Sequence, residues 1–159
     1  MKLLEIVHPA AIVSSLQSQE RNGVVRELVD ALAAAGQIGA DAVENVTRSI
    51  LARERSRGTT GFGKGAAAPH AKIEGLPRVV AAVGRSESGV DFASLDREPV
   101  YCVFLILSPA ERPEEHLHAM DMVFRHLQQD TFRRFFRQSK DSAAILDLLR
   151  EADERLTVR

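Results

Sequence analysis

The sequence predicts an α/β fold in which one β-sheet carries helices on both faces, and three observations lead to it. The chain has 159 residues, the size of one domain at about 100–200 residues per domain. Apolar residues at helical spacing occur before and after a strand-rich middle. Within that middle, residues 100–107 (VYCVFLIL) are apolar on both faces, which is typical of a strand in a sheet covered on both sides. We therefore expect a single domain over residues 1–159, with the strand order left open.

A first helix is expected to run from Asn22 to about Ala35, whereas residues 3–16 show no decisive pattern. Asn22 is a candidate N-cap, and Gly36 stands where a C-terminal glycine is common. The apolar residues of this helix recur at i, i+3, i+4 and i+7: Val25, Leu28, Val29 and Leu32.

A second helix is expected from Asp41 to near Gly58. Asp41 and Glu44 have the spacing of a capping box. The apolar face of this helix comprises Val43, Val46, Ile50 and Leu51. Residues 58–70 (GTTGFGKGAAAPH) then change in character, because a glycine-rich segment favours neither a helix nor a regular strand.

Short strands and then three helices are expected in the remainder of the chain. The strands are expected at residues 79–83, 90–92 and 100–107. Pro113 suits the first turn of a helix that reaches about Gln128. Asp130 and Asp141 are candidate N-caps of the last two helices. The inward-facing residues of these two helices are expected to be Phe132, Phe135 and Phe136, and Ala144, Ile145, Leu148 and Leu149.

The composition is that of an ordinary globular protein and argues against several classes of function. Hydrophobic residues make up 45% and charged residues 27%, with a net charge of −1, so no excess of charge favours nucleic acid or an anionic membrane as a partner. No apolar run reaches the roughly 18 residues that would indicate a membrane span. The single cysteine, Cys102, cannot form an intramolecular disulfide. A reducing, cytoplasmic compartment is the expectation.

Part of the glycine-rich segment matches a nucleotide-binding P-loop. Gly58, Gly63 and Lys64 fit the pattern G-x-x-x-x-G-K, but Gly65 replaces the serine or threonine that would hold magnesium. A P-loop also joins a strand to a helix, whereas this segment follows an expected helix. Both departures argue against a nucleotide site.

The end of the segment contains a candidate nucleophile. Pro69 restricts the backbone immediately before His70, and the nearby glycines allow another group to approach closely. A neutral imidazole nitrogen is a nucleophile, and free backbone N–H groups can stabilise phosphoryl oxygens. His70 is therefore a candidate phosphoryl acceptor, although a hydrogen-bonded surface histidine is the commoner role of a Pro-His pair.

The whole glycine-rich segment favours His70 as a phosphoryl acceptor over a hydrogen-bonded surface histidine. Residues 58–70 closely resemble the active-site segment of the IIA components of the bacterial phosphoenolpyruvate-dependent sugar phosphotransferase system, of the fructose, mannitol and nitrogen-regulatory type. That family shows the pattern G-S-T-G-[IF]-G-x-G-[VIA]-A-[IV]-P-H. The resemblance continues through residues 90–100 and 115–117, and so covers nearly the whole chain. It implies the mannitol-type IIA fold, a mixed β-sheet sandwiched by helices.

The resemblance also implies a function. His70 would accept a phosphoryl group from the phosphocarrier HPr, or its nitrogen-branch counterpart, and pass it to a IIB domain. His116 matches the family's second active-site histidine. No metal or organic cofactor is expected in the transfer itself.

The residues around His116 favour an inward position independently of the resemblance. An apolar stripe of the expected helix comprises Leu117, Met120, Val123, Phe124 and Leu127. His116 lies within this stripe, whereas His118 and His126 are expected to point away from it. A core histidine bonded to a backbone carbonyl is the alternative. A zinc site made by His70, His116 and His118 is disfavoured, because residues i and i+2 of one helix do not face the same ligand.

Further residues are candidates for supporting a phosphoryl group. Arg53 and Glu54 resemble the Arg-Glu that the family carries before the glycine segment, and an arginine there would offset the phosphoryl charge. The spacing leaves Arg55 and Arg57 as alternatives, and a solvated helix end as the simpler interpretation. The other candidates for phosphoryl binding or support are Gly63, Gly65 and Lys72.

Alternatives from other classes of function stay open. A regulatory interaction module would change partners when His70 is phosphorylated, as nitrogen-type members of the resembled family do. A small-ligand-binding domain without phosphoryl chemistry would be favoured by a main cavity far from His70. The basic residues of 133–140 could dock an acidic partner or nucleic acid, although an amphipathic helix explains their spacing more simply.

Overall fold

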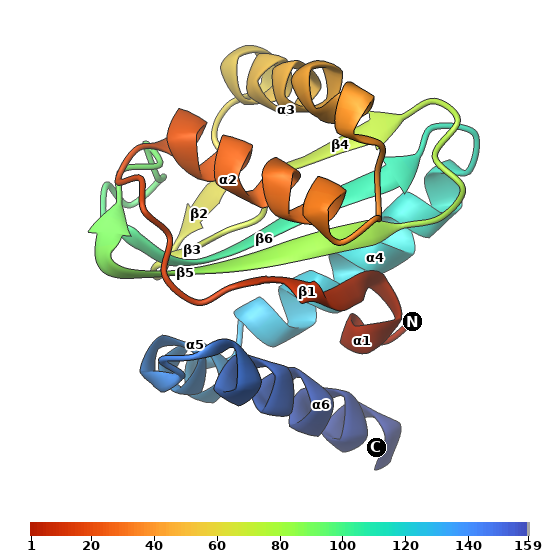
Figure 1. Cartoon of the computed structure of the whole chain (residues 1–159). Coiled ribbons are helices and arrows are strands. Elements are labelled where there is room, and N and C mark those ends of the chain that lie inside the picture. Colours follow the sequence, from red (N-terminus) through yellow and green to blue (C-terminus); the bar gives the residue numbers. More distant parts are fainter. Residues whose placement is uncertain (159) are drawn as a thin grey trace.

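A computed structural model describes residues 1–158 and shows a six-stranded mixed sheet with helices on both faces (Figure 1). The helices are α1 (Leu3–Ile6), α2 (Arg21–Ala34), α3 (Val43–Arg57), α4 (Pro113–Leu127), α5 (Asp130–Gln138) and α6 (Ser142–Val158), with a 3₁₀ turn at Ala40–Ala42. The strands are β1 (Val7–Val13), β2 (Gly61–Gly63), β3 (Ala66–Ala67), β4 (His70–Ile73), β5 (Val80–Val90) and β6 (Val100–Pro109). The α/β fold expected from the sequence is confirmed.

Strand β6 is the centre of the sheet, as its apolar sequence predicted. β5 pairs antiparallel with one edge of β6, and β1 pairs parallel with β5. β3 and β4 both pair parallel with the other edge of β6, one after the other along its length. β2 pairs antiparallel with β3. The register places His70 opposite Ile106 and Lys72 opposite Ser108.

Two layers of helices bury opposite faces of the sheet (Figure 1). Helices α2 and α3 cover one face, and α4, α5 and α6 cover the other. Alternate residues of β6 divide between the two cores, as the period of two in a strand requires. Phe104 and Ile106 join the core under α4–α6, whereas Leu105 and Leu107 join the core under α2 and α3.

Three of the expected helix caps are wrong. Asn22 lies inside the first turn of α2, whose N-cap is Glu20. Asp41 belongs to the 3₁₀ turn before α3, and Glu44 pairs with Arg26 at 2.5 Å instead of closing a capping box. Asp130 is the first residue of α5 and bonds to a side chain within that helix. The Asn22 and Asp130 side chains bond to arginine side chains of their own first turns and do not cap a backbone N–H.

Two helix ends agree with the sequence. Asp141 caps α6, because its Oδ1 accepts the N–H of Ala144 at 2.8 Å. Gly36 adopts φ +73° after the last turn of α2, and the next N–H bonds back to Leu32 O at 2.9 Å. This is the C-terminal geometry for which glycine is favoured.

The inward face of α4 differs from the predicted stripe. Leu117 is 67% exposed, whereas His126 is only 2% exposed. The His126 ring lies 5.5 Å from that of Phe132, because α5 folds back against the end of α4. Phe135, expected inward on α5, is 43% exposed. Packing of α5 against the end of α4 therefore accounts for the burial of His126.

The glycine-rich segment contains more regular structure than expected. Residues 61–67 form a short antiparallel pair, β2 and β3, around a turn in which Lys64 and Gly65 have φ of +60° and +78°. Residues 90–92 do not form a separate strand, because β5 runs on to Val90.

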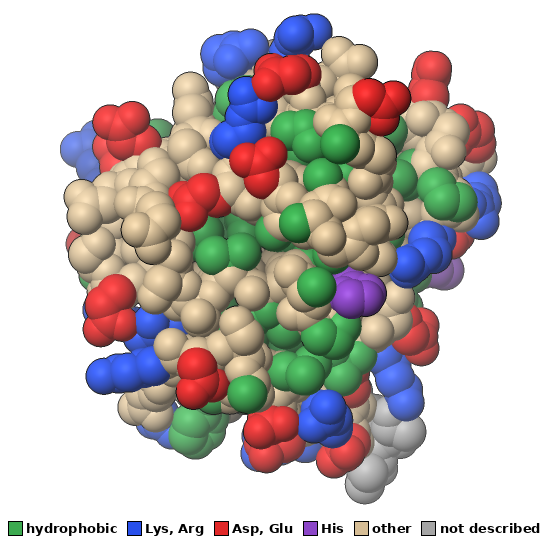
Figure 2. Space-filling view, in the orientation of Figure 1, with side chains coloured by type: hydrophobic (Ala, Val, Ile, Leu, Met, Phe, Trp, Pro, Cys, Tyr) green, Lys and Arg blue, Asp and Glu red, His purple; other side chains and the backbone are tan. Residues whose placement is uncertain are grey.

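Figure 2 shows acidic and basic side chains interspersed over one face, in keeping with the net charge of −1. Among residues 1–158, none of the helices is long and apolar enough to cross a bilayer.

Candidate functional site

His70 is held at the start of β4 by the sheet itself. Pro69 is buried, and its carbonyl accepts the N–H of Ile106 from β6 at 3.0 Å. The preceding residue, Ala68, donates its N–H to Thr60 O at 3.2 Å. With backbone bonds on both sides of the Ala68–Pro69 connection, the half-buried His70 ring is presented from a fixed backbone.

The hydrogen bond of His70 assigns its tautomer. His70 Nδ1 lies 2.9 Å from the carbonyl oxygen of Ala68. A carbonyl oxygen only accepts, so Nδ1 carries the proton in the neutral ring. Nε2 is then the nitrogen with a free lone pair, the form that a nucleophilic imidazole needs.

His116 faces His70 from the first half of α4. The two ring centroids are 5.2 Å apart, with the planes inclined by 48°. His116 is buried, and its Nδ1 lies 2.8 Å from Ser108 Oγ near the end of β6. The inward position expected for His116 is therefore observed, with a serine hydroxyl as its partner and not a backbone carbonyl. The role of Ser108 was not predicted. Ser108 follows the apolar run of residues 100–107, and the pattern of that run does not indicate which side chain the serine would contact.

The surroundings keep both rings neutral. Burial lowers the pKa of His70 below its usual range, and the charge of Arg53 also lowers it, against the bond to Ala68, which raises it. Burial, followed by the electrostatic effects of His70 and Lys72, lowers the pKa of His116 to about 4. Near pH 7 the site thus holds two uncharged imidazoles in contact.

Among the three candidate arginines, Arg53 is the one whose charge acts on His70. It lies near the end of α3 and donates from Nη1 to Gly58 O at 2.8 Å, whereas Arg55 and Arg57 are exposed. Lys72 is exposed and lowers the pKa of both histidines, so its ammonium also acts on the site. Two positive charges therefore act on the site, that of Arg53 on His70 and that of Lys72 on both histidines.

Glu54 anchors the glycine-rich segment to α3. It is 3% exposed, and its two carboxylate oxygens accept the N–H of Thr60 at 3.1 and 3.2 Å. The Thr60 hydroxyl donates to the same carboxylate. Sequence reasoning noted Glu54 only as part of the Arg-Glu resemblance. A single acidic residue just before a glycine segment carries no signal for this contact.

Gly63 and Gly65 lie at the turn between β2 and β3, whereas His70 comes later in the chain, at the start of β4. Gly63 has φ +112°, and a Cβ there would come within 3.1 Å of Asp96 Oδ2. Gly65 has φ +78°, and a Cβ there would come within 3.4 Å of the Tyr101 ring. Asp96 accepts the N–H of Lys64 at 2.9 Å, so these glycines permit a tight backbone approach.

The chemistry available at the site is nucleophilic transfer by an imidazole, and a metal centre is not assembled. Across the described residues, no group of three or more His, Cys, Asp or Glu side chains could hold a metal ion. His118 is exposed on α4 and does not join the other two histidines.

A family model agrees with the motif and the geometry. The model for "Phosphoenolpyruvate-dependent sugar phosphotransferase system, EIIA 2" matches residues 5–152. The chain belongs to this family. As a IIA protein it is a component of the phosphotransferase system, with relatives of both the sugar and the nitrogen-regulatory kind.

Three relatives of the IIA protein are informative. It is 32% identical over 154 residues (97% of the chain) to the PTS system fructose-specific EIIABC component of Bacillus subtilis, of which it spans only 24%. It is 32% identical over 149 residues (94% of the chain) to a nitrogen regulatory protein of Bradyrhizobium diazoefficiens, of which it spans 95%. The structure of nitrogen regulatory protein IIA-Ntr from Neisseria meningitidis superimposes with a TM-score of 0.81 at 24% identity, over 91% of this chain and 97% of that one. This last likeness confirms the IIA fold.

Proposed function

We propose that this IIA protein is a phosphoryl carrier with His70 as the phosphorylated residue and residues 1–159 as one functional domain. The observation that carries the proposal is the neutral His70–His116 pair, with His70 Nδ1 bonded to Ala68 O and Nε2 left free. The donor would be an HPr-like phosphocarrier in the cytoplasm, and the recipient a IIB domain.

The transfer step uses only groups that the site holds. The lone pair of His70 Nε2 attacks phosphorus, the N–P bond forms, and the bond from phosphorus to the donor breaks with its electron pair left on the donor. The ring becomes positively charged while Nδ1 keeps its proton, and the carbonyl of Ala68 then stabilises that charge through the existing hydrogen bond. Transfer of this kind depends on positioning and electrostatics more than on covalent help.

His116 is proposed as the residue that positions the phosphoryl group. Ser108 holds its Nδ1, and its neutral state avoids a second charged ring beside His70. A neutral imidazole can donate a hydrogen bond to a phosphoryl oxygen. Arg53 and Lys72 supply the positive charge that favours the bound dianion. Gly63 and Gly65 are proposed as indirect supports, through the hairpin that precedes His70.

The name of the fructose relative supports a IIB recipient. That protein is an EIIABC component, and the IIA protein corresponds to about a quarter of it (24%). We infer that the phosphoryl group moves from His70 to a B-type unit, whether on another chain or on the same one.

The test is phosphorylation by a reconstituted phosphoenolpyruvate, enzyme I and HPr mixture with labelled phosphate. Wild type should gain acid-labile label, and His70→Ala should gain none. His116→Ala should slow labelling, whereas His118→Ala, on the exposed side of the same helix, should not. Label that persists in His70→Ala would refute the assignment.

A second candidate, a regulatory switch, is favoured by the nitrogen regulatory relative, 95% of which is matched. A phosphoryl group on His70 adds nearly two negative charges, about −1.5 to −2, to a surface that binds a target protein. Affinity capture with wild type, His70→Ala and His70→Glu tests this. The switch predicts different partners among the three forms, and an identical set would count against it.

Ligand binding without phosphoryl chemistry is the weaker interpretation, although cavities away from His70 do exist. One of about 770 Å³ is lined by Arg85, Tyr101 and Arg137, and a smaller one lies between α5 and α6. A protein donor needs an accessible ring on the surface and no deep cavity. Together with membership of the IIA family, the exposed part of His70 favours transfer.

A further inference from the structure

The cavity of about 770 Å³ is a partly open groove bounded by α5, the start of β6 and the turn that joins β2 to β3. We call it the α5 groove. Neither His70 nor His116 lines it. Cys102 lines the groove, and β6 advances about 20 Å from residue 102 to Ser108, which contacts His116. The α5 groove is therefore separate from the phosphoryl site.

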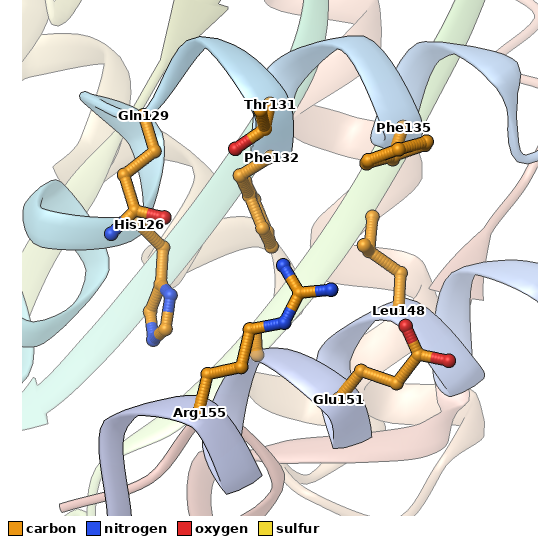
Figure 3. Close-up of a pocket in the computed structure, with 9 residues that line it drawn as sticks. His126, Gln129, Thr131, Phe132, Phe135, Leu148, Glu151 and Arg155 are labelled. Carbon is orange, nitrogen blue, oxygen red and sulfur yellow. The ribbon is translucent and has the colours of Figure 1, made fainter. Parts of the chain in front are cut away.

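The basic wall of the groove follows from the two faces of α5. Phe132 and Phe136 are buried, and Figure 3 shows Phe132 and Phe135 on the side of α5 that faces α6. At 3.6 residues per turn, the arginines of α5 fall on the other side of the helix. All of them line the groove: Arg133, Arg134 and Arg137.

Positive charge is in excess in the groove. Six cationic and four acidic side chains line it, a net charge of +2, although the whole chain carries −1. Arg133 pairs with Asp130, and Arg85 pairs with Glu87 at 2.6 Å. Within residues 1–158, the other four cations of the groove form no ion pair: Lys64, Arg134, Arg137 and Lys140. A concave surface with unpaired charge of one sign attracts a partner of the opposite sign.

Arg137 is positioned by contacts at both its backbone and its side chain. Its carbonyl oxygen accepts a hydrogen bond from Arg85 Nε at 2.8 Å, and Arg85 is only 3% exposed. Its guanidinium carbon lies 3.5 Å from the centroid of the Tyr101 ring. The N–H groups of that guanidinium make no hydrogen bond to any described residue. A guanidinium held over an aromatic ring keeps the donors at its edge available for a carboxylate, which it binds with two parallel hydrogen bonds.

We propose that the α5 groove binds an acidic segment of a partner protein, with Arg137 as the central contact. An aspartate or glutamate of that segment would accept the two hydrogen bonds of the Arg137 fork. The unpaired cations on either side would attract further carboxylates: Lys64, Arg134 and Lys140. They come from the β2–β3 turn, from α5 and from the residues after it, so an extended segment reaches more of them than one small anion does.

The acidic residues of the groove favour a peptide over nucleic acid. Asp96 and Glu98 line the groove on the side of Lys64. The phosphate charge of a nucleic acid is continuous along its strand, and it would be repelled there. A peptide can place a neutral or basic residue beside these carboxylates. This binding does not depend on phosphorylation of His70.

The test uses a fluorescent peptide in which glutamate and glycine alternate, mixed with the full chain. Binding measured by anisotropy should be saturable and should weaken as salt is added. In the ¹⁵N-labelled chain, the peptide should shift the amides of α5 and of residues 96–102. A peptide with glutamine in place of each glutamate, and an oligonucleotide of equal net charge, should each bind at least about tenfold more weakly. No saturable binding of the glutamate peptide, or equal binding of either control, would overturn the proposal.

Matched variants separate the groove from general attraction between charges. Arg137→Gln should weaken peptide binding about tenfold, and Arg137→Lys should weaken it too, because lysine lacks the planar fork. Tyr101→Phe keeps the ring beside Arg137 and should bind as wild type does. Arg48→Gln removes one charge from an exposed position of α3, on the other face of the sheet, and should leave binding unchanged.

A last variant separates this result from phosphoryl transfer. His70→Ala should bind the glutamate peptide as tightly as wild type does, whether or not His70 is the phosphorylated residue. Equal weakening by Arg137→Gln and Arg48→Gln, or loss of binding in His70→Ala, would overturn the assignment to the α5 groove.

Discussion

Replacing Ser108 with alanine tests whether one hydroxyl holds His116 in place. Ser108 Oγ lies 2.8 Å from His116 Nδ1, and Ser108 is fully buried at 0% exposure. Loss of the hydroxyl removes a bond and leaves the buried Nδ1 without a partner, which costs about 1–3 kcal/mol. For a chain of this length we expect the melting temperature to fall by roughly 2–10 °C.

Ser94 offers a matched control for the same chemical change. It is 7% exposed, and its Oγ is buried without a hydrogen-bond partner within residues 1–158. Ser94→Ala removes a buried polar atom that gains nothing from the fold, so its free energy of unfolding should stay unchanged or rise. The difference between the two alanine variants therefore isolates the bond to His116.

The assay pairs urea denaturation with the rate of phosphorylation. Ser108→Ala should lower the denaturation midpoint without changing the slope, and should slow labelling of His70 about tenfold, the equivalent of roughly 1.4 kcal/mol. Ser94→Ala should match wild type in both measurements. Equal stability of the two variants would refute the bond's contribution. A destabilised Ser108→Ala that is labelled at the wild-type rate would show that Ser108 does not position His116.

Three further predictions follow from the geometry. His116 has a pKa of about 4 in the folded protein and about 6.5 in the unfolded chain, so on acidification the unfolded chain binds the proton first. The free energy of unfolding measured by urea denaturation should therefore fall from pH 7 to pH 5, and it should fall less in His116→Asn. Gly63→Ala, with φ +112° and Asp96 within 3.1 Å of the new Cβ, should cost about 1–3 kcal/mol, more than Gly36→Ala, where φ is +73° and nothing lies within 4 Å. Burial raises the pKa of the Cys102 thiol, so a thiol reagent should react with it only after denaturation.

The central strand and most helices could be predicted because their signals are local. A run apolar on both faces has few places to lie except the middle of a covered sheet, and β6 lies there. The inward face of α4 could not be read in full, because its end is covered by α5 and α6 and not by the sheet alone. His126 became buried against Phe132 for that reason.

Some residues of the site could likewise be predicted from local signals, and others could not. The motif that ends in Pro69-His70 indicated the nucleophile, and helical spacing indicated that His116 faces inward. Ser108 and Glu54 were not predicted, since their contacts join segments whose relative placement depends on the folded sheet. Each of the two residues acts through a hydrogen bond to one neighbour. The residue type alone does not indicate which neighbour that will be.

The register between β4 and β6 is what brings the parts of the site together. Successive side chains of a strand point to opposite faces, so His70 and Lys72 face α4 while Ala71 and Ile73 enter the core under α2 and α3. A slip of one residue would reverse these faces and turn the imidazole into the apolar core.

The same strand end also sets the position of His116. Ser108 lies one residue before the end of β6, and α4 begins at Pro113, so the chain returns over that strand end within one short connection. The bond from Ile106 N–H to Pro69 O fixes β4 against the same part of β6. Both histidines are therefore positioned by contacts with β6. The distance between their rings depends on the β4–β6 pairing more than on any single side chain. Substitutions that loosen this pairing should consequently impair phosphoryl transfer before they unfold the protein.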